Sequence, residues 1–439
     1  MLSIEQYIER HAQNAPQRVA MVLNGEEITY GELHQCTMLR TQHYQGMQRK
    51  GVVLRARCDA DFLISYFAVH VAGAVAVLLP ATATPEQVRR MEKALQGFDF
   101  PEGSADVLFT TGTTGTPKGV VIGTRAITAS AENIVHGQAY RYDIRFVVPG
   151  QPNHLGCLSK VWATMLVGAT CCLMPKFDFN EFFAVVSSAK EMGVGAFLVP
   201  SCIRMLTKFG GKQMEDAAMK MAFIETGGDA LDAQTMAELH KQLPHTRLFN
   251  TYASTETGVV ATFEFTHHHL AGCVGHALPN AHFDITPEGY IRCAGDTLMS
   301  GYLRTGEQTT YEPQTEESFT TCDCGEIDNQ GRLRFKCRDS DIINTGGFKV
   351  SPQEVESAAN SLVEVKACIC IATPHPILGQ ALKLLVVADG DVEINAKDLA
   401  RRLKEQLEPH QVPLFYERVE ALALTPNGKI DRKRYLLRQ

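Results

Sequence analysis

The feature that most constrains the fold of this chain is a repeated alternation of short apolar, β-rich runs with helical stretches. Clear runs occupy Ala196–Val199, Phe223–Ile224 and Arg247–Phe249. Gly227–Gly228 comes soon after the second run and Asn250 directly follows the third, so these strands end at turns that lead into the next element. This order is typical of layered α/β folds, in which ligands bind at the ends of the strands. We therefore expect an α/β protein.

The length and a change of character along the chain predict two domains. The 439 residues are roughly two to four times the size of a typical domain. Around Arg338–Asp341, charged residues follow a hairpin-like segment with Asn329–Gly331 as its turn. After this point come a helix starting at Ser351, two β-rich runs and an amphipathic helix. We predict a large domain at 1–339, a small α+β domain at 340–439, and a hinge at the charged junction.

Composition excludes several classes of protein. The net charge of −7 and the isoelectric point of about 6.1 provide no basic field for nucleic acid, so any nucleotide should be a small ligand. The thirteen cysteines form no framework, and Cys322, Cys324 and Cys337 lack the spacing of a zinc site. The first residues carry charges and no apolar signal core. We expect free thiols in a reducing cytoplasm and no structural metal.

One apolar segment, Phe62–Leu79, is long enough to resemble a membrane span. His70 and Gly73 lie near its centre, and Asp59 and Asp61 precede it. We interpret the segment as a buried helix that ends near Gly73, followed by a core strand. No integral membrane segment is expected.

The strongest local motif follows the apolar run Val107–Phe109. It consists of Thr110, Thr111, Gly112, Thr113, Thr114, Gly115, Thr116, Pro117, Lys118 and Gly119. Glycines permit close approach of the backbone, so that amide groups can point at phosphate oxygens. The threonine hydroxyls add neutral donors and Lys118 adds a full charge, although the Walker pattern is absent. A flexible surface turn is the alternative, but this composition favours phosphate binding.

The segment Thr111–Gly119 resembles the phosphate loop of the adenylate-forming superfamily, which includes acyl- and aryl-CoA ligases, luciferases and the adenylation domains of peptide synthetases. Further segments match in the family's order from about Ile28 to Arg432. The resemblance implies a large multi-sheet N-terminal domain with a small mobile C-terminal domain. It also implies activation of a small carboxylic acid with ATP and Mg²⁺, giving an acyl-adenylate and pyrophosphate, and then transfer of the acyl group to a thiol.

The resemblance assigns nucleotide-binding roles to two segments. Gly227, Gly228 and Asp229 are similar to the turn that lines the adenine and acyl pockets, and Asn250, Thr251, Tyr252, Ala253, Ser254, Thr255 and Glu256 to the stretch around the nucleotide. By this match Tyr252 stacks on adenine and Asn250 contacts its amino edge. Thr255 contacts the α-phosphate and Glu256 holds Mg²⁺, a hard cation that prefers carboxylate oxygen.

Three further residues receive roles in the same way. Asp323 matches the aspartate that accepts both ribose hydroxyls, and Arg338 the arginine that also reaches the ribose. Both are otherwise ordinary loop charges. Lys429, in a Pro-Asn-Gly-Lys segment, matches the lysine of the mobile catalytic loop, where it bridges the substrate carboxylate and the α-phosphate.

The acyl pocket is less well defined. His154 resembles the family's histidine beside the acyl group but is about one residue off the usual spacing. Val259 and Val260 after the Glu256 turn suggest an apolar wall, and Gly258 and Val259 are the candidate substrate residues there. The chain departs from the family where Ala253 and Cys322 replace glycines, which requires negative φ at both, and where Ser340, followed by Asp341, occupies the expected hinge position. The segment before Thr110 is also short, and a homodimer is one way to cover the surface this exposes.

The acceptor thiol is open between two candidates. Gly346, Gly347 and Lys349 belong to a segment that resembles the loop lining the pantetheine tunnel of CoA ligases. A tight β-turn is the simpler reading of the glycines. No carrier-protein motif follows Lys429, so we favour free coenzyme A over a separate carrier protein. A luciferase-like oxidation has no sequence signal, and a non-catalytic relative would be expected to lose Lys429 or Glu256.

Overall fold

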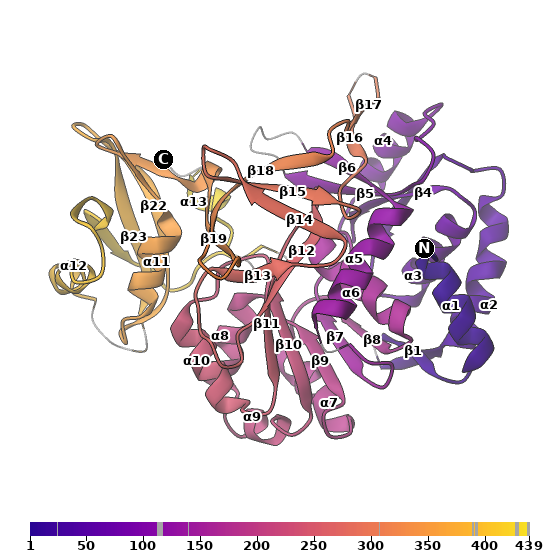
Figure 1. The fold of residues 1–439 in the computed structure, drawn as a ribbon, viewed down its shortest axis with the longest axis horizontal. Helices are drawn as coiled ribbons and strands as arrows, with labels where there is room; N and C mark the ends of the chain where they lie inside the picture. Colours follow the sequence, from indigo (N-terminus) through magenta and orange to yellow (C-terminus); the bar gives the residue numbers. More distant parts are fainter. Residues whose placement is uncertain are drawn as a thin grey trace.

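The computed structural model describes residues 1–23, 25–111, 117–138, 140–306, 308–388, 390, 394–425 and 430–436, without the side chains at positions 111, 117, 340, 433 and 436. Its strands form three sheets (Figure 1). In spatial order the largest contains β14 (Ala281–Ile285), β15 (Tyr290–Gly295), β18 (Ser318–Ile327), β19 (Leu333–Arg338), β13 (Cys273–Ala277), β12 (Gly258–Glu264), β11 (Arg247–Ser254), β10 (Met221–Gly227), β9 (Val194–Phe197), β7 (Arg145–Pro149), β8 (Thr170–Met174), β1 (Val19–Leu23) and β2 (Glu26–Thr29).

The two other sheets are smaller. The second contains β17 (Thr310–Pro313), β16 (Gly301–Arg304), β6 (Pro117–Gly123), β5 (Ser104–Thr111), β4 (Val75–Pro80) and β3 (Gly51–Ala56). The third contains β21 (Phe348–Val350), β20 (Ile343–Thr345), β23 (Gly379–Ala388) and β22 (Val365–His375), with β24 (Phe415–Arg418) paired to β23.

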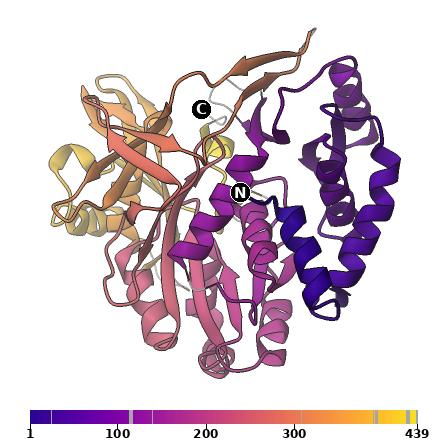
Figure 2. The same ribbon diagram turned by 45° about the vertical axis from the view of Figure 1, so that its right-hand side comes forward.

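Helices separate and cover these sheets (Figure 2). They are α1 (Ile4–Asn14), α2 (Tyr30–Thr41), α3 (Ala60–Val71), α4 (Pro85–Leu95), α5 (Thr124–Gly137), α6 (Leu155–Val167), α7 (Phe179–Ser188), α8 (Pro200–Phe209), α9 (Gly211–Ala217), α10 (Ala233–Gln242), α11 (Pro352–Asn360), α12 (Ala396–Leu403) and α13 (Lys433–Leu436), with 3₁₀ turns at Gln42–Tyr44, Asp339–Asp341 and Pro409–Gln411. The helix α6 packs against β7 and β8, and α5 packs against β12. The predicted α/β class is confirmed.

The centre of the largest sheet is parallel and deeply buried. The strands β7, β8, β9, β10 and β11 pair in parallel, and every residue of β10 is buried. Parallel strands that are covered on both faces have nearly continuous apolar sequences. For this reason the strands near Ala196 and Phe223 could be predicted from the sequence. Their carboxyl ends meet at one edge, where Gly227 and Ser254 end β10 and β11.

The apolar segment that resembles a membrane span forms a helix and a strand, as predicted. The helix α3 begins after Asp59, whose carboxylate accepts a hydrogen bond of 2.8 Å from the amide of Phe62. It ends before Gly73, which has a φ of +70°, and β4 follows as a buried strand. Within the described residues, no helix has the length and apolar character needed to cross a membrane.

A buried polar network joins α1 and α3 to β5, the strand that leads into the threonine-rich motif. Nδ1 of His70 lies 2.8 Å from Oε1 of Glu5, and Nε2 lies 3.0 Å from Oδ1 of Asp106. The hydroxyl of Tyr66 donates to Oδ2 of Asp106 and accepts from the indole of Trp162. Burial disfavours a charge on His70, yet the two carboxylates together raise its pKa to about 10. The network therefore fixes β5 four residues before Thr110.

The residues after the Asp339–Asp341 turn have a core of their own. Apolar side chains from β20, β22, β23, α11 and α12 pack together, and none of them belongs to the main core cluster of the large sheets. We propose that the domains divide at this turn, between positions 339 and 340. Figure 1 shows the third sheet and its helices beside α8 and α10, and Nζ of Lys366 lies 5.2 Å from the ring centre of Phe209 across this contact.

The start of α11 differs in detail from the prediction. Ser351 is the N-cap residue by position and Pro352 is the first helical residue, but the serine hydroxyl makes no capping hydrogen bond. Glu354, three residues after Ser351 and so at the position that would complete a capping box, instead accepts a hydrogen bond of 2.6 Å from the side-chain amide of Gln411. The tertiary contact thus replaces the local capping box.

Candidate active site

The strand pair β5–β6 fixes both ends of the threonine-rich motif. The strands are antiparallel, and their register places Thr110 opposite Lys118 and Thr111 opposite Pro117. Gly112, Thr113, Thr114, Gly115 and Thr116 lie outside the described residues. A short connection closed by paired strands brings its two ends together, so Lys118 lies at the mouth of the candidate phosphate loop.

The turn that carries Thr255 and Glu256 is held in place by its neighbours. The hydroxyls of Ser254 and Thr257 lie 2.9 Å apart, and the amide of Thr257 donates to the serine oxygen. The carbonyl of Glu256 accepts from the amide of Met299 at 2.8 Å. Local side-chain to backbone bonds of this kind define a tight turn. The carboxylate of Glu256 is therefore presented from a fixed backbone at the end of β11.

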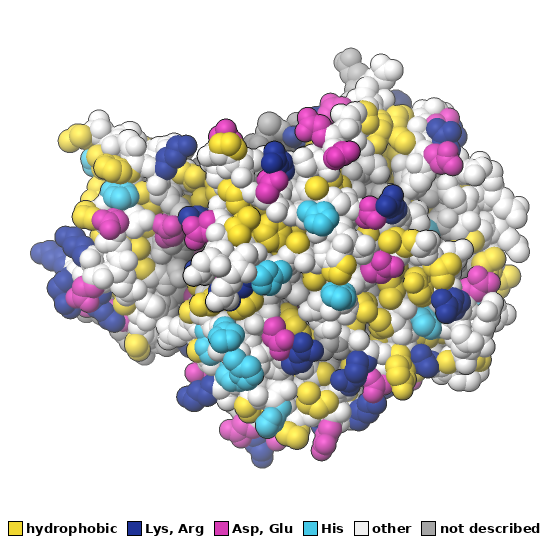
Figure 3. Space-filling view, viewed as in Figure 1, with side chains coloured by type: hydrophobic (Ala, Val, Ile, Leu, Met, Phe, Trp, Pro, Cys, Tyr) yellow, Lys and Arg dark blue, Asp and Glu magenta, His cyan; other side chains and the backbone are white. Residues whose placement is uncertain are grey.

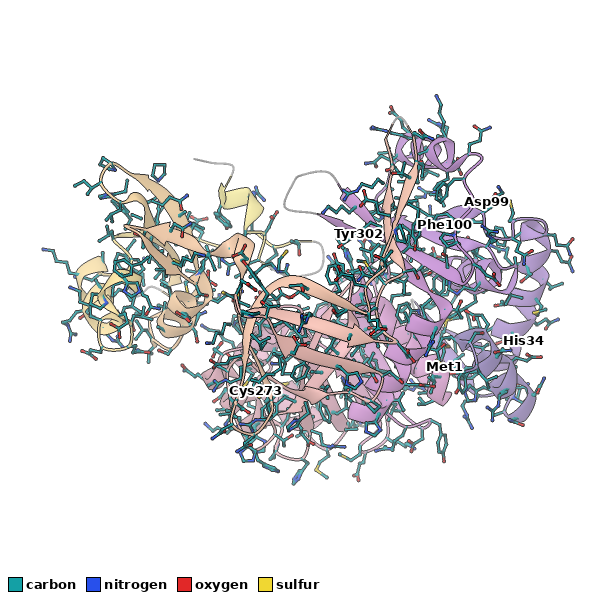
Figure 4. The ribbon with its side chains drawn as sticks, turned by 45° about the horizontal axis from the view of Figure 1, so that its top comes forward. Met1, His34, Asp99, Phe100, Cys273 and Tyr302 are labelled. Atoms are coloured by element: carbon teal, nitrogen blue, oxygen red, sulfur yellow. The ribbon has the colours of Figure 1, made fainter. Side chains whose placement is uncertain are left out.

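Tyr302 on β16, labelled in Figure 4, lies next to both candidate phosphate-binding segments. Its hydroxyl donates a long hydrogen bond of 3.4 Å to Oε1 of Glu256, and Nζ of Lys118 lies 5.5 Å from the centre of its ring. Burial, followed by the charge of Glu256, raises the pKa of the tyrosine. Tyr302 was not predicted from the sequence, because a single tyrosine after Gly301 has no pattern that separates it from an ordinary strand residue.

The two residues predicted to bind the ribose, Asp323 and Arg338, form one hydrogen-bonded group with Tyr252, which was predicted to stack on adenine. The hydroxyl of Tyr252 donates to Oδ2 of Asp323 at 2.9 Å, and Nε of Arg338 donates to Oδ1 at 2.9 Å. Asp323 is 4% exposed. The β18–β19 register aligns Asp323 with Arg338, which explains why residues 15 positions apart meet. Burial and the carboxylate of Asp323 raise the pKa of Tyr252, so its phenol remains a donor.

The candidate adenine residues lie midway along β11 and at the turn that follows β10. Asn250 on β11 pairs in register with Thr226 on β10. Its amide nitrogen donates a hydrogen bond of 2.9 Å to the carbonyl of Cys273, labelled in Figure 4. This contact turns the amide oxygen, an acceptor, away from Cys273, and an acceptor is what an adenine amino group requires. The turn Gly227–Asp229 follows β10, and Gly228 has a φ of +80°.

The base of the candidate catalytic loop in the C-terminal domain is described, although Lys429 itself lies outside the described residues. Leu424 and Ile430 form an antiparallel bridge around it, and the guanidinium of Arg432 is bonded to the carboxylate of Glu356. Burial opposes the charge on Arg432, but Glu356, then Asp229 and Asp341, raise its pKa. The ion pair with Glu356 on α11 therefore anchors the base of the loop within the small domain.

The remaining predicted residues are more dispersed. His154 is the N-cap residue of α6. Gly258 has a φ of +65°, and a Cβ there would lie 2.6 Å from the carbonyl oxygen of Thr297, so the position requires glycine. Val259 is fully buried. Gly346, Gly347 and Lys349 are exposed in and beside the turn between β20 and β21, where both glycines have positive φ.

The two departures from the family pattern are accommodated by the backbone. Among the described residues, the non-glycine residues with positive φ are Arg49 and Met192. Ala253 and Cys322 therefore meet the expected condition of negative φ, since both lie in extended strands.

All thirteen cysteines are free, as predicted. On most of the face shown in Figure 3, acidic and basic side chains are interspersed, and a small group of basic side chains lies at its left-hand edge.

The fold and the site define the chain as a two-domain α/β protein with a candidate nucleotide site. Residues 101–303 match the AMP-binding enzyme family, and residues 354–429 match the AMP-binding enzyme C-terminal domain. These two matches together cover more than half of the chain. The chain therefore belongs to the AMP-binding enzyme family, which confirms the resemblance to the adenylate-forming superfamily.

Individual relatives agree with this assignment. The chain is 28% identical over 343 residues to the 2-succinylbenzoate–CoA ligase of Staphylococcus aureus, an alignment spanning 75% of this chain and 66% of that enzyme. ATP-bound MatB from Rhodopseudomonas palustris superposes with a TM-score of 0.85 at 20% identity, covering 99% and 98% of the two chains. MenE from Bacillus subtilis, in complex with its acyl-adenylate, has a TM-score of 0.78 at 19% identity, covering 98% and 97%. The solved structures thus share the fold.

Proposed function

We propose that the chain is an AMP-forming acid–thiol ligase. It activates a carboxylic acid with ATP to an acyl-adenylate and pyrophosphate, and then transfers the acyl group to coenzyme A. The proposal rests on one observation. Tyr302 lies close to both Lys118 and Glu256, next to the paired strand ends of the threonine-rich motif. A cation, a hydroxyl and a carboxylate at one point suit a triphosphate with its metal ion.

The first step is a displacement at phosphorus. A carboxylate oxygen of the acid attacks the α-phosphorus of ATP, the new P–O bond forms, and the bond to pyrophosphate breaks. Lys118 and Lys429 supply positive charge to the phosphates, and Thr255 supplies a hydroxyl. One such charge at ~4 Å contributes about 4 kcal/mol at an effective dielectric constant of 20, before desolvation. Asp323 and Arg338 hold the ribose and Asn250 the adenine.

Glu256 suits a magnesium ion by its chemistry and position. It offers hard carboxylate oxygen on a fixed turn, and its Oε1 already faces the hydroxyl of Tyr302. Bound Mg²⁺ would neutralise charge on the departing pyrophosphate. Within the described residues there is no group of three or more ligating side chains, as suits an ion whose other ligands are phosphates and water.

In the second step the thiol sulfur attacks the acyl carbonyl, a thioester bond forms, and AMP leaves. Gly346 and Gly347 border the proposed path of the pantetheine chain. Because they lie on the small domain, at the exposed turn of β20 and β21, this role requires the small domain to rotate. Asp339–Asp341 is the proposed hinge, with Ser340 or Asp341 as its pivot.

Acid-dependent ATP–pyrophosphate exchange, followed by mass spectrometry of the CoA thioester, tests the proposal. Lys429→Ala should abolish exchange while ATP binding, measured by calorimetry, stays nearly unchanged. A bulky residue at Gly347 should spare exchange and block thioester formation. Exchange without any CoA thioester, but with loading of a carrier protein, would favour the carrier as acceptor. Full exchange by Lys429→Ala would refute the proposed role of the lysine.

A further inference from the structure

A buried ion pair lies at the carboxyl end of β10, beside the candidate nucleotide turn. Nζ of Lys160 on α6 is 2.6 Å from Oε1 of Glu225 on β10, and the two side chains are 3% and 0% exposed. Nζ of Lys160 also lies 5.1 Å from the ring centre of Phe197 on β9. Glu225 precedes Gly227 by two residues, so both face the same side of the sheet. The pair therefore lies next to the strand end where ligands bind in α/β sheets.

Two glycines border the ring of Phe197 at this point. A Cβ at Gly156, one turn before Lys160 on α6, would lie 3.5 Å from Cζ of the ring, an ordinary contact. A Cβ at Gly227 would lie 3.9 Å from Cε2 of the same ring. Crowding does not require glycine at position 156, and glycine destabilises a helix relative to alanine. Glycine at position 156 therefore leaves the side of α6 that faces the Phe197 ring without a side chain.

The second oxygen of Glu225 needs a hydrogen-bond donor. Among the described residues neither Oε2 of Glu225 nor the hydroxyl of Tyr140 has a partner, and both groups are buried. The ring of Tyr140 packs 4.7 Å from Phe146 and 5.2 Å from Phe223, centre to centre. Burial, and then the charge of Glu225, raise the pKa of Tyr140. A buried carboxylate oxygen is strongly stabilised by a hydrogen-bond donor. The site should therefore prefer a ligand that donates a hydrogen bond to Oε2 of Glu225.

The charge of the pair decides which donor it prefers. Lys160 is already neutralised by Glu225, so the site has no net charge to offer a second carboxylate, which would lie against Glu225. An ammonium group would in turn lie against Lys160. Unbalanced charge in a buried site is costly. An uncharged donor, such as a hydroxyl group, satisfies Oε2 without this cost.

Building on the proposed ligase function, we infer that Lys160 and Glu225 set the specificity for the acid and select one whose side chain carries an uncharged hydrogen-bond donor. The hydroxylated aryl and acyl acids are the simplest members of this class. Lys160 orients the carboxylate of Glu225, and Glu225 accepts the bond from the substrate. Gly156 provides the space through which the substituent reaches them.

Matched acids test the inference in ATP–pyrophosphate exchange. The panel pairs benzoate with its three hydroxybenzoates and hexanoate with hydroxyhexanoates, and adds an aminohexanoate and the dicarboxylate 2-succinylbenzoate. At least one hydroxylated acid should exceed its parent and both charged acids by about tenfold or more in kcat/KM, because sites built to bond a hydroxyl reject analogues that lack it. A preference for an unsubstituted or a charged acid would overturn the inference.

A paired substitution separates specificity from structure. Lys160→Met with Glu225→Leu removes both charges together, so that neither partner is left buried alone. This variant should lose the preference for the hydroxylated acid and accept the parent acid at least as well. The matched control replaces the exposed pair Lys241 and Glu238 of α10 by Met and Leu, and should keep the original ranking. An unchanged ranking in the Lys160/Glu225 variant would show that the pair only braces α6 against β10.

If no ATP–pyrophosphate exchange is detected, calorimetric measurement of acid binding still tests the inference. The absence of exchange with every acid would refute the proposed function. A hydroxylated acid that still binds about tenfold more tightly than its parent, and loses this margin in the double variant, would support the pair as a recognition site. Equal binding of the two acids would overturn it. Gly156→Ala, which fits sterically, should weaken binding of the preferred acid without lowering the melting temperature.

Discussion

The hydroxyl of Tyr252 donates a hydrogen bond of 2.9 Å to Oδ2 of Asp323, although 71 residues separate them. The same carboxylate accepts from Arg338 through Oδ1. Each carboxylate oxygen can accept more than one hydrogen bond, so this arrangement fixes the carboxylate and leaves acceptor sites for a vicinal diol. The pair therefore connects the strand proposed to face adenine with the strand proposed to hold the ribose.

Removing this hydroxyl should weaken nucleotide binding. Tyr252→Phe keeps the ring but leaves a buried oxygen of Asp323 without one of its donors, a change that typically costs about 1–3 kcal/mol. We expect the Kd for ATP to rise about tenfold, measured by calorimetry. The acid dependence of pyrophosphate exchange should change little. An unaltered Kd would contradict the proposed link between Tyr252 and the ribose site.

The contact between Tyr302 and Glu256 makes a separate prediction about magnesium. Glu256→Gln removes a charge and a hard oxygen ligand, so exchange should require a Mg²⁺ concentration about tenfold or more higher. Tyr302→Phe removes only the long 3.4 Å hydrogen bond and should have a smaller effect in the same direction. The measurement is the rate of exchange as a function of Mg²⁺ at saturating ATP. Equal magnesium dependence in wild type and Glu256→Gln would remove the glutamate from the metal site.

The fold and the motifs were predictable from sequence for different reasons. The strands near Ala196 and Phe223 were recognisable because both faces are buried, and α3 because Asp59 and Gly73 mark its ends. Candidate ligands were recognisable where several lie close together in sequence, as in Asn250–Glu256. Each of these signals is local.

What the sequence did not reveal depends on contacts between distant segments. Tyr302 is 46 residues from Glu256, and Lys160 is 65 residues from Glu225. A single lysine on an apolar helix and a single glutamate in an apolar strand do not indicate an ion pair in the sequence. The two residues meet only because the order of strands in the sheet brings α6 and β10 together. The network of Glu5, His70 and Asp106 was missed for the same reason.

The base of the C-terminal loop should control catalysis without contacting the nucleotide. Arg432, two residues after the bridge at Ile430, is ion-paired with Glu356 on α11. Arg432→Met should therefore displace the lysine loop and lower kcat for exchange by about tenfold or more, while the Kd for ATP changes little. The control is Arg434→Met, because Arg434 is exposed, and it should behave as wild type. A kcat unchanged by Arg432→Met would show that the ion pair does not position the loop.

The buried histidine should make stability depend on pH in a defined direction. His70 has a pKa of about 10 in the fold and about 6.5 when unfolded. The folded state therefore binds its proton more tightly, and this contribution is complete below about pH 6.5 and is lost as the pH rises through about 10. His70→Gln leaves two buried carboxylates without their cation, which should reduce the free energy of unfolding by about 3 kcal/mol at pH 6.

The pH dependence should be tested on the difference in the free energy of unfolding between wild type and His70→Gln. Lysine, tyrosine and cysteine also titrate in the alkaline range, and their contribution cancels in this difference. Measured by urea unfolding at pH 6, 8 and 9.5, the difference in the free energy of unfolding between the two proteins should become smaller as the pH rises. His268→Gln, at an exposed histidine, should show no such trend. A difference that stays constant across this range would mean that His70 is neutral in the fold. In that case the hydrogen bonds of the network, rather than its charge, would hold β5 before the threonine-rich motif.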